Sequence, residues 1–67
     1  MKNLEIKIKE CLIEKLKGIK HKKANMIVER CKQLINIHRS WIVFAQFKQT
    51  PEQMAEVLYQ YELNLTQ

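Results

Sequence analysis

Aspartate is absent from this chain of 67 residues, and glycine and proline occur once each. So few turn-forming residues favour a small number of long helices over many short strands. The two cysteines, Cys11 and Cys31, are fewer than the four or more of a typical small secreted disulfide framework. We therefore expect free thiols and a reducing, cytoplasmic location.

Long apolar runs are also missing. The longest, Trp41 to Ala45, is far shorter than the roughly 20 residues that a membrane-spanning helix needs. Charges at Glu5 and Lys7 interrupt the first residues, where a signal peptide requires an unbroken apolar segment. The sequence thus predicts neither a membrane span nor a signal peptide.

Residues that could carry catalysis or hold a metal ion are sparse. Ser40 is the only serine, no aspartate can complete a triad, and His38 would point to a different side of a helix. The two cysteines and two histidines match no zinc-binding spacing, and no glycine-rich loop could cradle a phosphate. We therefore expect a protein that is not an enzyme and carries no metal or cofactor.

Apolar residues form 46% of the chain, which is too many for a disordered protein. Their spacing predicts one all-α domain of three helices, over residues 3–17, 25–48 and 51–64. Residues 4–9 leave an alternative open, because they also alternate with the period of a strand. A strand there would suit a DNA-binding ribbon–helix–helix dimer, although a long second helix does not.

Helix ends are marked by a few residues. Gly18 follows two lysines, which predicts a left-handed glycine cap at the end of the first helix, and Asn25 is the expected N-cap of the second. Thr50 and Gln53 around Pro51 predict a capping box for the third. The buried face expected for this last helix consists of Met54, Val57, Leu58, Tyr61 and Leu65.

The central helix is the strongest signal in the sequence. Its residues 41–47 are apolar almost all round, and two short neighbouring helices can hardly cover such a surface. A chain this short is also only marginally stable alone. We therefore expect a homodimeric helical bundle. The residues expected at a protein interface are Ile37, Trp41, Val43, Phe44, Phe47 and Tyr59. His38 interrupts the stripe, either as a pH-sensitive interface group or as a hydrogen-bonded core histidine.

The net charge of +5 permits an acidic partner. Cations gather around one predicted connector and include Lys15, Lys17, Lys20, Lys22 and Lys23. They either contact an anion or simply keep the connector solvated. The composition and patterning together predict a small regulatory or inhibitory protein that binds another macromolecule through an apolar, Lys-rimmed helical surface. The alternative is a dimeric nucleic-acid-binding regulator that uses the lysine cluster.

Overall fold

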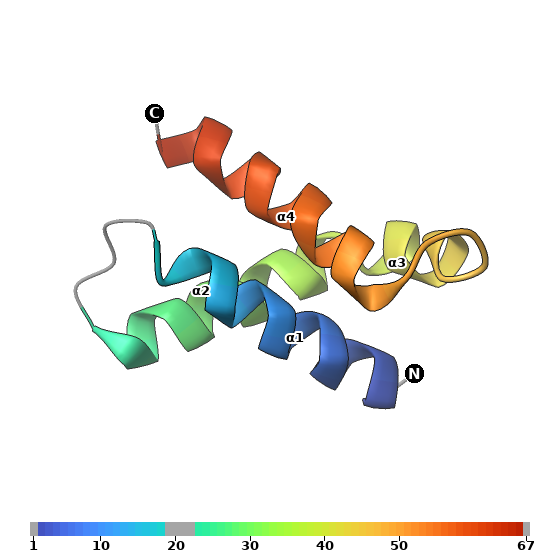
Figure 1. The fold of residues 1–67 in the computed structure, drawn as a ribbon, viewed down its shortest axis with the longest axis horizontal. Coiled ribbons are helices and arrows are strands. Elements are labelled where there is room, and N and C mark those ends of the chain that lie inside the picture. Colours follow the sequence, from blue (N-terminus) through green and yellow to red (C-terminus); the bar gives the residue numbers. More distant parts are fainter. Residues whose placement is uncertain (1, 19–22, 67) are drawn as a thin grey trace.

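The computed structural model describes residues 2–18 and 23–66, and these residues form four helices and no strand. The helices are α1 (Lys2–Leu16), α2 (Ala24–Ile37), α3 (Arg39–Ala45) and α4 (Pro51–Thr66). Figure 1 shows α2 running back against α1, while α4 lies over α1 and runs in the same general direction. No described helix is both long enough and apolar enough to cross a membrane.

The first helix settles the alternative at residues 4–9, because this segment is helical throughout. Ile8, Leu12 and Leu16 recur every four residues and are fully buried, so they form the stripe that a helical period requires. α1 packs against both α2 and α4 and is therefore the centre of the fold. The core joins residues of all four helices, namely Ile8, Leu12, Leu16, Ile27, Cys31, Leu34, Ile35, Ile42, Ala45, Met54, Ala55 and Leu58.

The prediction of a single long central helix over residues 25–48 is wrong in one respect. It is divided at His38, whose backbone angles of φ −100° and ψ 21° end α2 and begin α3. The backbone N–H of His38 and its ring nitrogen Nδ1 both approach the carbonyl oxygen of Leu34, at 3.1 Å and 2.9 Å. A side chain that joins the helical hydrogen-bond ladder is a known cause of bends. The fold thus has four helices rather than three.

Two predicted helix ends also differ from the structure. Gly18 does not adopt a positive φ, so the left-handed cap expected there is wrong. α2 begins with Lys23 as its N-cap instead of Asn25, and no side chain caps this end. Backbone groups satisfy part of it, since the N–H groups of Met26 and Ile27 both donate to the Lys23 carbonyl.

The capping box at the start of α4 is confirmed. The Gln53 N–H donates to Thr50 Oγ1 at 3.2 Å, and the Thr50 N–H donates to Gln53 Oε1 at 2.9 Å. Pro51 is the first helical residue, where its missing N–H is not needed. The buried face of α4 differs from the expected one, because it comprises Met54, Ala55, Leu58 and Glu62.

Candidate protein-binding surface

Exposed apolar side chains gather around α3 and the turn that follows it. Phe44 and Phe47 are 75% and 80% exposed, and Ile37, the last residue of α2, is 64% exposed. Val43 is exposed to a smaller extent. These four residues are called the α3 patch below. All four belong to the interface predicted from the sequence, and the structure leaves each of them in contact with solvent.

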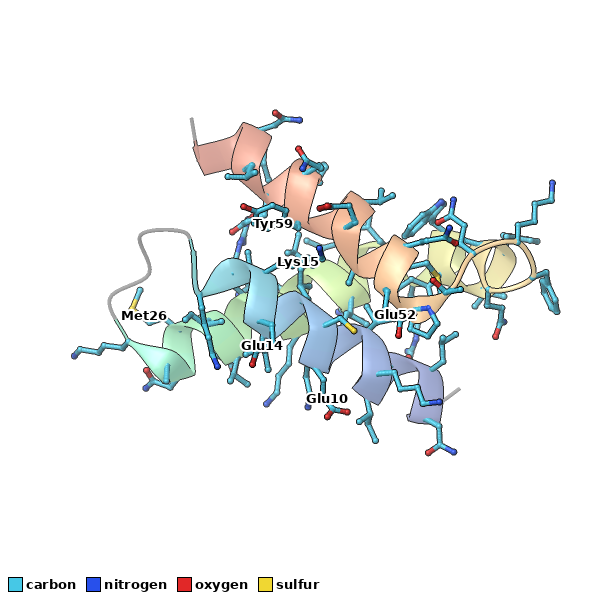
Figure 2. All side chains as sticks on the ribbon, viewed as in Figure 1. Glu10, Glu14, Lys15, Met26, Glu52 and Tyr59 are labelled. Carbon is cyan, nitrogen blue, oxygen red and sulfur yellow. The ribbon has the colours of Figure 1, made fainter. Side chains whose placement is uncertain are left out.

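The other two predicted interface residues lie elsewhere. Trp41 is half-buried and packs on the core, so most of the α3 patch lies beyond it in solvent. Tyr59 is half-buried on α4, and the ammonium of Lys15 lies 5.8 Å from the centre of its ring. Figure 2 shows Lys15 and Tyr59 side by side where α1 and α4 meet. Tyr59 therefore belongs to the α1–α4 junction.

A second exposed stripe runs along α4. Val57, Tyr61 and Leu65 are spaced by four residues and are 46%, 41% and 56% exposed. These three residues are called the α4 stripe below. The four-residue spacing could not distinguish this exposed stripe from the buried one. Met54, Leu58 and Glu62, each next to or near a member of the stripe, are buried with the same spacing. Tyr61 meets the His38 ring edge to face, with centroids 4.7 Å apart, so the α4 stripe reaches the helix break.

His38 is held in place by this contact and by its hydrogen bond. Since a carbonyl oxygen only accepts, Nδ1 must carry the proton that it shares with Leu34. The imidazole is half-buried against Tyr61 and fixes where α3 departs from α2. Of the two roles considered for His38, the hydrogen-bonded packing role matches these contacts.

A buried carboxylate was not foreseen. Glu62 is only 2% exposed at its side chain and pairs with Arg30, whose guanidinium is 32% exposed. Arg30 also donates from Nη1 to Gln33 Oε1 at 2.8 Å. The hydrogen bond to Glu62 raises the pKa of the Arg30 guanidinium. This pair links α2 to α4.

Cys31 lies fully buried on the same stretch of α2, whereas Cys11 on α1 is half-buried. Both thiols are free. Burial raises the pKa of the Cys31 thiol to about 11, and the Glu62 carboxylate adds to this effect. A thiol with so high a pKa is neutral at physiological pH and behaves as a small apolar core residue.

Three lysines of the predicted cluster, Lys15, Lys17 and Lys23, lie in the part of the chain that the structure describes. Lys15 pairs with Glu56 at 3.5 Å across the α1–α4 junction, and Lys17 pairs with Glu14 at 3.0 Å. Lys23 is exposed at the start of α2. Lys20 and Lys22 lie outside the described residues. Two of the five predicted anion contacts thus already have a carboxylate partner.

Groups for catalysis do not converge in the part of the chain that the structure describes. Ser40 is exposed at the start of α3, while His38 is directed to Leu34 and Tyr61. Among residues 2–18 and 23–66, no three histidine, cysteine or acidic side chains lie close enough together to hold a metal ion.

Comparison with known proteins gives no relative from which a role could be inferred. No protein-family model, curated protein or solved structure matches the chain significantly. Any function has to be argued from the surface itself.

Proposed function

We propose that this chain is a small, non-catalytic protein that regulates or inhibits another polypeptide by binding it through the α3 patch. We also propose that two copies of the chain bind each other through the α3 patch, so that a homodimer and a complex with another polypeptide exclude each other. The observation that carries the proposal is the exposure of Phe44 and Phe47. Free thiols at both cysteines suit a reducing compartment, and we propose that the protein acts there.

The free energy available at the α3 patch is large for so small a chain. Burying one phenylalanine or isoleucine side chain contributes roughly 1.5–3 kcal/mol relative to leaving it in water. Exposed aromatic residues that enter a pocket on a partner are also frequent hot spots of binding. Phe44, Phe47 and Ile37 together could therefore anchor a stable complex.

Charge supports a second copy as the partner. Residues 40–47 contain no charged side chain, although each chain carries a net charge of +5. Two copies can therefore face each other across this segment with their nearest cations, Arg39 and Lys48, only at its two ends. A standard interface buries about 800 Å² per partner, which is about one sixth of the 4861 Å² surface of this chain.

The test is a photo-crosslinker in place of Phe44, with the same group at Lys7 as the matched control. Both positions are exposed, but Lys7 lies on α1. We expect adducts at position 44, either a dimer of this chain or a complex with another protein, and few at position 7. Equal yields at the two positions, or no adduct at position 44, would overturn the proposal.

Sedimentation equilibrium separates the homodimer from a complex with a different protein. We expect the chain to dimerise at micromolar concentration and a F44S/F47S variant to be monomeric. The variant L65S, which changes an exposed residue of α4, should dimerise as before. A monomeric parent chain would remove the homodimer and leave a different protein as the proposed partner.

Nucleic-acid binding stays the alternative because of the net charge of +5 and the exposed Lys23. It requires an affinity that falls steeply with salt, since cations release counterions from the phosphates. It also requires a further loss on changing Lys20, Lys22 and Lys23 to glutamate. An affinity that hardly depends on salt would exclude this alternative.

A further inference from the structure

A groove between α1 and the α2–α3 segment is separate from both exposed apolar surfaces. Its volume is about 400 Å³, within the lower part of the range for small-molecule sites. The residues that line it are Glu5, Ile6, Lys9, Lys32, Ile35, Asn36 and Arg39. It is called the α1–α2 groove below.

Its chemistry combines an aliphatic floor with positive charge. Ile35 is almost fully buried and Ile6 is half-exposed, so apolar surface remains open between the two helices. Arg39 is paired with Glu5 at 3.1 Å at one end of the groove. Lys9 and Lys32 form no ion pair with any described residue. Three cations against one carboxylate leave the α1–α2 groove with a net charge of +2.

We propose that the α1–α2 groove binds a small aliphatic carboxylate, with its anionic head between Lys9 and Lys32 and its chain against Ile6 and Ile35. An ammonium and a carboxylate attract most strongly where an apolar wall displaces water. The methylene stems of the two lysines extend that wall. The proposal does not depend on the function proposed for the α3 patch.

The lining disfavours two other ligand classes. None of its seven residues is aromatic, so a nucleobase would find no ring to stack on. An acidic helix from another protein would extend along α1, where Glu10 and Glu14 are exposed and would repel it. Figure 2 shows both glutamates on the edge of α1 that is turned away from α4. A short carboxylate avoids this repulsion because it ends within the groove.

The test uses octanoate as the probe and amide-resolved NMR titration of the full chain. We expect saturable shifts at Ile6, Lys9, Lys32 and Asn36, with a dissociation constant on the order of 1 mM. The neutral alcohol octanol should bind several-fold more weakly, because it lacks the anionic head. Shifts confined to the α3 patch, or no saturable shift, would overturn the proposal.

Two double variants of equal charge change complete the test. K9Q/K32Q should weaken octanoate binding about three- to tenfold, as expected for the loss of two partly exposed ion pairs. K7Q/K48Q alters exposed lysines outside the groove and should leave the affinity within about twofold of the parent. Equal weakening by both variants would show a non-specific charge effect and contradict the proposed site. Circular dichroism checks that both variants keep their helices, and the octanol comparison on the parent chain needs no variant.

Discussion

The Arg30–Glu62 pair gives a stability prediction whose magnitude follows from unequal burial. Replacing Arg30 by methionine keeps the aliphatic stem but leaves the carboxylate of Glu62, 2% exposed, without its charged partner. Removing one partner of a buried pair costs about 3–5 kcal/mol. Arg30 is one-third exposed, so water can partly replace it, and we expect R30M to lose about 2–3 kcal/mol.

The opposite change should cost less. In E62Q the guanidinium of Arg30 still reaches water and keeps its hydrogen bond to Gln33, so we expect a loss of only about 1 kcal/mol. The double variant R30M/E62M replaces both charges by apolar groups and should lie within about 1 kcal/mol of the parent.

Urea unfolding followed by far-ultraviolet circular dichroism measures all three variants, at more than one protein concentration in case the chain dimerises. A domain of this size is expected to be stable by roughly 3–10 kcal/mol, so a loss of 2–3 kcal/mol is readily seen. The reasoning fails if E62Q is as destabilising as R30M, or if the double variant is worse than either single one.

Three further predictions follow from the helix ends and the buried thiol. T50A removes the acceptor for the Gln53 N–H and should lower the unfolding free energy by about 1 kcal/mol in urea unfolding, whereas an unchanged midpoint would show that the cap is unimportant. H38A removes the hydrogen bond and ring contact at the helix break and should cost about 1–2 kcal/mol, with loss of the ring-current shifts of Tyr61 in the NMR spectrum. The pKa of Cys31, raised by burial to about 11, lies above its unfolded value near 9.0. The thiol's contribution to stability is therefore complete below about pH 9 and falls by roughly 1–3 kcal/mol as the pH rises to 11. The urea midpoint of a C31A variant should show less of this decline, and equal declines would contradict it.

The helices themselves could largely be predicted from local chemistry. The stripe Ile8, Leu12 and Leu16 on α1 is buried, and the capping box at Thr50 has the hydrogen bonds that its residue types require. These features depend on neighbours in the sequence. The exposure of Phe44 and Phe47 also agrees with the argument that residues 41–47 are too apolar to be covered by two short helices.

The remaining features depend on how the helices meet, which local patterns do not determine. The apolar period continues through His38, so the sequence did not predict the helix break there. At this break the His38 ring forms a hydrogen bond with the Leu34 carbonyl. The burial of Glu62 could not be predicted, because a carboxylate is rarely buried without a partner and its partner Arg30 is 32 residues away in the chain. Val57 was expected to be buried, yet α4 turns the adjacent residues toward the core. The α1–α2 groove could not be foreseen, since it unites residues of two separate helices.

The Arg30–Glu62 salt bridge also bears on the register of α4. The side chains that α4 buries along α1 are mostly apolar, and apolar contacts depend less on the exact partner than a buried charge does. A shift of α4 by one turn would move the buried carboxylate of Glu62 away from the guanidinium on α2, whereas Arg30 would still reach water. This polar contact near the C-terminal end of α4 thereby adds to the Lys15–Glu56 pair in favouring the observed register over a shifted one.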